Sequence, residues 1–238
     1  MSAPKAWPAA VAMARAWQVQ LAPLVSLRPL PGLPRVLAGV DAAYGKDDQH
    51  LYGAAVLLAW PELTVLESVS VAGPVPFPYI PGLLSFREAP ILQAAVRKLT
   101  VRPDVIMVDG QGIAHPRGLG LASHLGLLLG IPTIGCAKSR LTGEFGELGQ
   151  EKGSWCPLLS AGLVVGYVVR SRRGCRPVFV SPGHLITLAE SLALVRTCLG
   201  GYRLPVPLRA AHLASTQVRR ERGAASGAPG KPAAVGLV

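Results

Sequence analysis

Hydrophobic residues recur along the first third of the chain with two periods, one helical and one extended. In residues 11–22, Met13, Trp17 and Leu21 are four positions apart, which predicts a helix that ends before Pro23. A proline-rich connector follows, and apolar runs bounded by turn residues then predict strands at residues 35–41, 51–59 and 64–71. The polar turns between these strands are short, so we expect an antiparallel meander.

The rest of the chain alternates short buried strands with helices. We predict helices at residues 87–99, 118–129 and 185–199, and strands at residues 105–108, 133–136, 163–169 and 177–180. The order strand, helix, strand across residues 105–136 implies a parallel pair, and the last two strands are expected to form a hairpin. Three antiparallel strands followed by parallel strand–helix units indicate an α/β protein with a ribonuclease H-like fold, in which helices cover both faces of a mixed sheet. That fold by itself does not determine a function.

Length and composition favour one large domain. The chain has 238 residues, enough for a full hydrophobic core, and its mean hydropathy is +0.38. The longest apolar run, residues 125–137, is interrupted by glycines and a proline and is shorter than the roughly 20 residues of a membrane span. Arg15 interrupts the apolar stretch after Lys5, so no secretory signal is expected. We therefore expect a cytoplasmic monomer without a membrane partner, with a catalytic domain in residues 1–220 and a disordered, low-complexity tail in residues 221–238.

Charge is distributed unevenly along the chain. The net charge is +11, yet residues 1–151 hold 12 basic and 11 acidic side chains, whereas residues 152–238 hold 12 basic and two acidic ones. An excess of this kind favours a polyanionic partner such as nucleic acid, with Arg172 and Arg173 in one basic cluster and Arg219 and Arg220 in another. The alternative is a basic face that only solvent contacts.

Two apolar strands each run into an aspartate, Asp41 after residues 36–40 and Asp109 after residues 105–108. Acidic residues are scarce in this chain and are seldom buried without a partner, so neighbouring strands of this kind suggest a divalent metal site. Aspartate is also a favoured turn residue, and capping a turn is the alternative role. The four cysteines show no metal-binding spacing and are expected to be reduced.

Three further segments contain candidate functional residues. Tyr79 lies between Pro78 and Pro81, which could stiffen it as a wedge or simply pack it in a loop. Glu88 follows Ser85 at the spacing of a helix capping box, so it could be a cap instead of a catalytic acid. Residues 109–120 hold four glycines around a strand-to-helix turn, where a ligand can approach the backbone closely. Lys138 and Arg140 follow a buried strand, where they could hold a phosphate or belong to a solvated loop.

Taken together, these segments resemble the endonuclease V family of DNA-repair enzymes. The resemblance also includes Gly-Val-Asp-Ala-Ala-Tyr at residues 39–44, Val-Ser-Pro-Gly-His at residues 180–184 and Gly-Tyr-Arg-Leu-Pro at residues 201–205, and it extends from about residue 11 to about residue 217. The chain departs from the family's usual Pro-Glu-Pro-Thr-Arg at residues 205–209, where it loses an acid and a hydroxyl.

The resemblance implies an endonuclease that uses Mg²⁺, with Mn²⁺ as a substitute, recognises deoxyinosine in DNA, and cuts the second phosphodiester on its 3′ side. Asp41, Asp109 and Glu88 match the family's metal-binding acids, and Lys138, His115 and His212 match further active-site residues. Tyr79 matches the wedge that replaces the flipped base. The pocket for that base matches four residues, Gly82, Leu84, Gly110 and Gly120, and we expect Arg140, Arg172 and Arg173 to contact phosphates.

Two other functions are open at this stage. One is a ribonuclease H-like nuclease that acts on inosine-containing RNA or on structured DNA, because a backbone-built pocket need not sense the 2′-hydroxyl. The other is a protein that binds inosine without cutting, against which the three intact acids argue.

Overall fold

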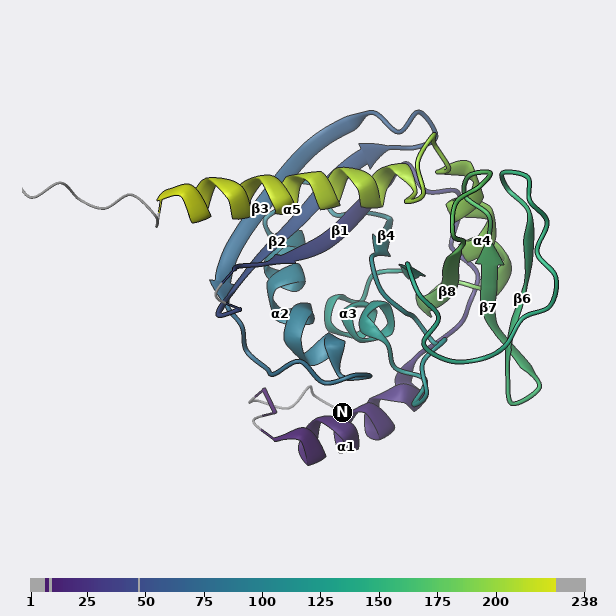
Figure 1. Cartoon of the computed structure of the whole chain (residues 1–238), viewed down its shortest axis with the longest axis horizontal. Helices are drawn as coiled ribbons and strands as arrows, with labels where there is room; N and C mark the ends of the chain where they lie inside the picture. The colour runs from purple at the N-terminus through teal and green to yellow at the C-terminus, as the bar shows by residue number, and fades with distance from the viewer. Residues whose placement is uncertain (1–6, 9, 47, 226–238) are drawn as a thin grey trace, which may run out of the picture.

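One mixed β-sheet forms the centre of the molecule. The computed structural model describes residues 7–8, 10–46 and 48–225. Its strands lie in the order β3-β2-β1-β4-β5-β8-β7-β6 (Figure 1). Their bounds are β1 Val36–Tyr44, β2 His50–Ala59, β3 Val65–Pro74, β4 Val105–Val108, β5 Thr133–Ala137, β6 Trp155–Ser160, β7 Leu163–Val169 and β8 Val178–His184.

The first half of the sheet confirms the predicted topology. β1 pairs antiparallel with β2, and β2 pairs antiparallel with β3, which is the expected meander. β4 then pairs parallel with β1, and β5 pairs parallel with β4. β1 is longer than predicted, because it continues to Tyr44 while it stays paired with β2.

The second half of the sheet is antiparallel and holds one strand that the hydrophobic pattern did not predict. β8 pairs antiparallel with β5 and with β7, so the hairpin expected there is confirmed. β6 adds to β7 as an edge strand. β6 contains Pro157 and exposes Trp155, and both features are tolerated at a sheet edge because one side of the strand faces solvent.

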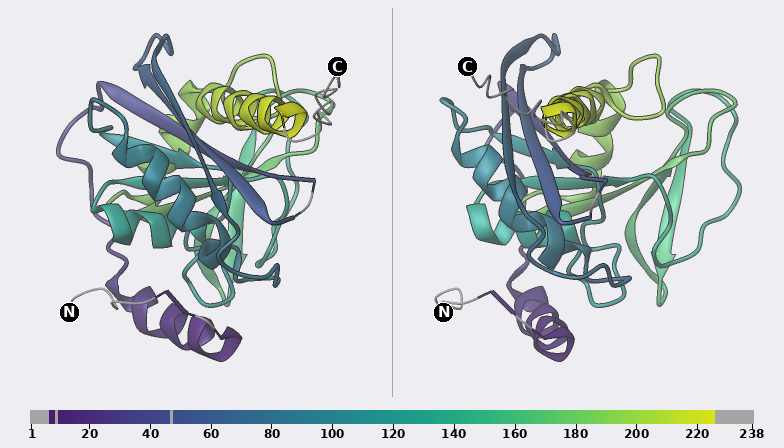
Figure 2. Two further views of the ribbon diagram at one scale, coloured as in Figure 1. Left: turned by 90° about the vertical axis from the view of Figure 1, so that its left-hand side faces the viewer. Right: turned by 60° about the vertical axis from the view of Figure 1, so that its left-hand side comes forward.

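Helices cover both faces of the sheet. α2 (Leu84–Arg97) and α3 (Leu121–Leu129) pack on one face, and α4 (Leu188–Thr197) and α5 (Val206–Ala225) pack on the other (Figure 2). α4 begins at a capping box in which Thr187 and Glu190 bond each other's backbone. α5 was not predicted. It begins beside Pro205 and Pro207. Proline lacks a backbone N–H, but the first N–H groups of a helix have no helical partner, so proline is tolerated there.

The predicted tail boundary at residue 220 lies inside α5. α5 continues to Ala225, and residues 226–238 lie outside the described residues, so disorder of the tail stays a prediction. Among the helices in the described part of the chain, none combines the length and the apolar character needed to cross a membrane.

Alternation along the central strands directs their side chains into two separate cores. Val40 and Val108 face α2 and α3, whereas Leu37 and Met107 face α4 and α5. Asp41 is four positions after Leu37 on β1, and alternate residues of a strand share a face, so its side chain is on the α5 face of the sheet. α1 (Val11–Leu21) is confirmed as a helix and lies outside this sandwich, beyond the ends of α2 and α3 (Figure 1).

Candidate active site

Asp41 and Asp109 are neighbours at the end of the parallel ladder between β1 and β4. The last paired residues of that ladder are Val40 and Val108, and the backbone N–H of Asp109 donates to the Val40 carbonyl at 3.3 Å. The prediction that Asp41 ends its strand is wrong, because β1 continues beside β2. The ladder with β4 nevertheless stops one residue before both acids. The two carboxylates therefore come from adjacent strands at equivalent positions.

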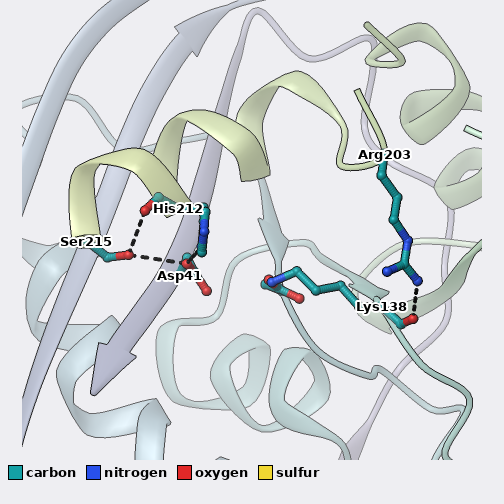
Figure 3. Close-up of polar contacts among 6 residues, drawn as sticks. Asp41, Lys138, Arg203, His212 and Ser215 are labelled. Carbon is teal, nitrogen blue, oxygen red and sulfur yellow. Dashed lines mark hydrogen bonds and ion pairs between the residues drawn. The ribbon is translucent and has the colours of Figure 1, made fainter. Parts of the chain in front are cut away.

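α5 supplies two polar side chains to Asp41. His212 Nδ1 lies 2.8 Å from Asp41 Oδ2, and Ser215 Oγ donates to the same oxygen at 3.2 Å (Figure 3). α5 can approach β1 because residue 39 is glycine. A Cβ there would lie 2.0 Å from the Pro207 carbonyl oxygen. The sequence identified His212, whereas Ser215 became visible only through the packing of α5.

Lys138 pairs with the second aspartate. It follows β5, and its amine forms an ion pair with Asp109. Arg203 holds the backbone of this segment: its guanidinium donates to the Lys138 carbonyl (Figure 3) and to the carbonyls of Arg176 and Pro177 at 3.0 Å each. Because Arg203 bonds both segments, the loop that carries Lys138 is joined to the arginine-rich turn before β8.

Glu88 joins this group from the opposite face of the sheet. It lies in the first turns of α2, and Oε1 accepts a hydrogen bond from the Tyr44 hydroxyl at 2.6 Å. Arg87 lies over the Tyr44 ring at 4.5 Å and forms an ion pair with Asp48. The alternative role of Glu88 as a cap is wrong, because α2 begins at Leu84 and has no side-chain cap at its start.

Electrostatics around these acids favour a cation. Burial raises the pKa of Glu88 to about 8; the Tyr44 hydrogen bond opposes this shift, and the charges of Asp41 and Asp109 add to it. The pKa of Asp109 is also raised, by burial and then by Asp41, against the opposing effect of Lys138. The raised pKa values of Glu88 and Asp109 show that negative charge is crowded here, so a positive ion would stabilise the cluster, and an all-oxygen donor set suits a hard divalent metal.

The acids do not form a finished cage. Across residues 7–8, 10–46 and 48–225, no three His, Cys, Asp or Glu side chains are arranged so that they could enclose a metal by themselves. Mg²⁺ is commonly held by one or two carboxylates together with water and substrate phosphates, so this open arrangement fits an ion that also contacts a nucleic acid backbone.

A pocket of about 320 Å³ adjoins the acids. Asp109 and Lys138 lie in its wall, together with every residue predicted for the base pocket: Gly82, Leu84, Gly110 and Gly120. Gly120 has no room for a side chain, and a side chain at Gly110 would be tightly packed. A Cβ on Gly120 would lie 2.3 Å from the Gln111 carbonyl oxygen, and a Cβ on Gly110 would lie 3.1 Å from the Leu121 side chain. The glycines therefore let the backbone come close to the pocket at these points.

Tyr79 and His115 lie at the same pocket but differ in environment. Tyr79 is 69% exposed and lies where Pro81 and Gly82 lead into α2, which is compatible with a wedge. His115 is buried, with Nε2 3.0 Å from the Gly82 carbonyl oxygen and Nδ1 accepting the Arg117 N–H at 3.1 Å. Burial lowers the pKa of His115 to about 4, so the ring is neutral near pH 7. These bonds place His115 as a support of the pocket wall.

The three predicted phosphate contacts lie on exposed loops. Arg140 lies 5.8 Å from the ring of Phe145. Arg172 and Arg173 lie on the turn between β7 and β8, where Arg173 is 3.7 Å from Glu151 and both partners are exposed. This turn is joined to the Lys138 loop through Arg203, but its contact with phosphate stays a prediction.

Sequence reasoning missed four side chains that shape the site: Gln18, Tyr44, Gln111 and Ser215. Gln111 donates to the Ser139 carbonyl at 2.8 Å and lines the pocket. The helix of residues 11–22 also contains Arg15 and Gln20, so no signal in the sequence singled out Gln18. All four depend on contacts between segments distant in sequence.

Comparison with known proteins finds relatives of one family. The sequence profile of the endonuclease V family matches residues 17–213. The endonuclease V of Geotalea uraniireducens is 52% identical over 208 residues, which cover 87% of this chain and 88% of the relative. The crystal structure of the endonuclease V from Streptomyces avermitilis superposes with a TM-score of 0.86 at 40% identity, over 92% of this chain and 97% of that one. A Ciona intestinalis endonuclease V, bound to a 24mer DNA containing an inosine followed by a ribo-adenosine, shares the fold with a TM-score of 0.77 at 24% identity, over 89% of this chain and 98% of that one.

Proposed function

The chain belongs to the endonuclease V family and is a nuclease, and we propose that its substrate is DNA containing deoxyinosine, which it nicks at the second phosphodiester on the 3′ side of the lesion. One observation carries the proposal: a pocket with three glycines in its wall adjoins the cluster of acids, and Asp109 and its partner Lys138 line both. A pocket beside a charged centre suits an enzyme that holds a base in one place and cuts the backbone in another.

The pocket supports recognition of a flipped base. Enzymes that read a damaged base take it out of the stack, and an inosine mispair costs less to open than a normal pair. The exposed Tyr79 at the rim could then fill the space that the base leaves. The Ciona protein, which has the same fold, is bound to inosine-containing DNA, and this supports inosine as the base.

Together with water and a substrate phosphate, the three acids would hold Mg²⁺, or Mn²⁺ in its place. When bound, such an ion polarises the phosphate and lowers the pKa of a water nucleophile. The residues of this chain prepare the site: His212 and Ser215 orient Asp41, Tyr44 orients Glu88, and Lys138 places a positive charge beside Asp109. A phosphate that approaches the acids would meet the amine of Lys138 at the pocket wall.

A nicking assay tests the proposal. The substrates are a labelled duplex with one deoxyinosine, the same duplex without it, and a matched RNA that contains inosine, each with Mg²⁺, with Mn²⁺ and with chelator. We expect one nick, 3′ of the lesion, that requires the metal. Cleavage of undamaged duplex at the same rate would contradict the proposal, and cleavage confined to RNA would favour the ribonuclease alternative. Action as a monomer in the cytoplasm stays a prediction from the sequence.

A further inference from the structure

Gln18 is a polar residue on the buried side of α1. The side chains of Met13, Trp17 and Leu21 suggested the helix, yet Met13 is exposed and the buried residues of α1 are Ala14 and Gln18. Gln18 is 1% exposed and also lines the pocket. A buried amide needs hydrogen-bond partners, and those of Gln18 lie in segments far away in the sequence.

The amide of Gln18 connects two walls of the pocket. Its Nε2 donates to the Gly82 carbonyl at 2.9 Å and to the Leu119 carbonyl at 3.1 Å. Gly82 belongs to the segment that follows Tyr79, and Leu119 immediately precedes Gly120 on the glycine-rich turn. One side chain therefore bonds to both segments between which a base would enter.

A second side chain strengthens this connection. Arg117 donates from Nη2 to the Gly82 carbonyl at 2.8 Å and from Nε to the Gln18 Oε1 at 2.5 Å. His115 Nε2 is also 3.0 Å from the Gly82 carbonyl, so three side chains converge on one oxygen with two lone pairs. Gly82 has φ +76°, a conformation that side-chain-bearing residues rarely adopt. The Gly82 carbonyl is thus fixed by three side chains from two separate segments.

We propose that Gln18 is a positioning residue for lesion recognition, which fixes the separation of the two pocket walls and the direction of the segment that carries Tyr79. The inference rests on the proposed function, because it assigns α1 a part in the selectivity of that same site. None of the hydrogen bonds of Gln18 involves one of the three acids. Replacing Gln18 should therefore weaken binding of the base and leave the rate of the chemical step unchanged.

The test replaces Gln18 with methionine, which keeps the length of the side chain and removes its hydrogen bonds. We expect the KM for inosine duplex to rise at least about tenfold, because the substitution removes all three hydrogen bonds of Gln18, while kcat stays within threefold of the unmodified chain. Affinity for undamaged duplex should not change. The matched control is Gln93→Met, because Gln93 on α2 also donates to a backbone carbonyl, that of Leu128 at 3.3 Å, and is absent from the pocket wall.

The outcomes separate the possible failures. If the unmodified chain does not prefer inosine, the proposed function fails before Gln18 is tested. If it does prefer inosine and Gln18→Met keeps that preference within twofold, the inference is overturned, whatever happens to the melting temperature.

If Gln18→Met does not fold, Arg117→Met removes the second donor to Gly82 and tests the same contact. The inference then expects loss of the inosine preference. An equal loss of affinity on inosine and undamaged duplex would instead mark Arg117 as a phosphate contact and overturn the inference.

Discussion

The acid cluster and the base pocket share a wall but are built in opposite ways. The cluster consists of charged side chains from β1, α2 and the end of β4, with Lys138 and α5 around them. The wall of the pocket includes three glycines, and side chains from α1 and from the segment after Gly112 donate hydrogen bonds to its backbone. Under the proposed function, chemistry would depend on the charged side chains, whereas selectivity would depend on loops held by donors from distant segments.

This contrast predicts two kinds of failure. Loss of a carboxylate should stop cutting and leave recognition of the base intact. A change in the pocket should weaken discrimination between inosine and normal DNA and leave the acids as they are. The comparison is wrong if both kinds of substitution affect both properties equally.

The largest effect is expected for the aspartates. Asp41→Asn or Asp109→Asn should slow nicking by at least a thousandfold, about 4 kcal/mol of barrier, because the amide removes the charge that would hold the metal. Binding of inosine duplex, measured without metal, should survive. A variant that cuts within about tenfold of the unmodified chain would refute the metal-binding assignment.

Next in size is a methyl group added to the pocket wall. Gly120→Ala should reduce the preference for inosine by about 1–3 kcal/mol, the usual cost of overpacking, because its Cβ would lie 2.3 Å from the Gln111 carbonyl oxygen. Gly146→Ala is the matched control, since no atom lies within 4 Å of the added carbon there. Competition binding between lesion and normal duplex measures the difference. An unchanged preference in Gly120→Ala would show that the wall does not contact the base.

Tyr79 tests whether the rim belongs to recognition. Tyr79→Ala should weaken binding to inosine duplex by about 1–3 kcal/mol, the usual contribution of one base–aromatic stack, and should affect single-stranded substrate less. Tyr79→Phe keeps the ring and is the control. Equal losses on duplex and single strand would mean that the ring serves packing alone.

The arginine-rich turn should affect affinity without selectivity. Neutralising Arg172 and Arg173 together should weaken lesion and normal duplex alike and reduce the slope of log K against log salt by about 1 to 2. Arg97→Gln with Lys98→Gln removes the same charge from exposed positions at the C-terminal end of α2, where Lys98 is the cap residue, and is the matched control. Binding titrations at several salt concentrations measure this slope. If the slope does not change in the double variant, Arg172 and Arg173 contact solvent and not phosphate.

The smallest effect concerns His115. Because its folded pKa is lowered to about 4, protonation opposes folding; the stability from the neutral ring is present above pH 6.5 and is lost as pH falls toward 4. His115→Gln, which can still donate to the Gly82 carbonyl, should keep the pH profile of nicking between pH 6 and 8. If the pH profile of His115→Gln lacks an inflection that the unmodified chain shows in that range, His115 takes part in the chemical step.

Local patterns were sufficient for most of the fold. Apolar runs of five to ten residues identified β1 to β3, and strand–helix–strand spacing identified the parallel pair of β4 and β5, because period and length are properties of a short segment. β6 and α5 were missed for local reasons too: Pro157 interrupts the strand, and Pro205 with Pro207 hides the start of the helix.

The same division applies to the site. The sequence by itself determined which acids and glycines to consider, since Asp41, Asp109 and the glycine-rich turn each lie within a recognisable segment. Only the tertiary structure decided that Asp41 lies inside β1, that Ser215 bonds it, and that Gln18 holds the Gly82 carbonyl. Those contacts join residues 64 to 174 positions apart. Periodicity within a segment contains no information about such pairs, because they form only when separate elements pack.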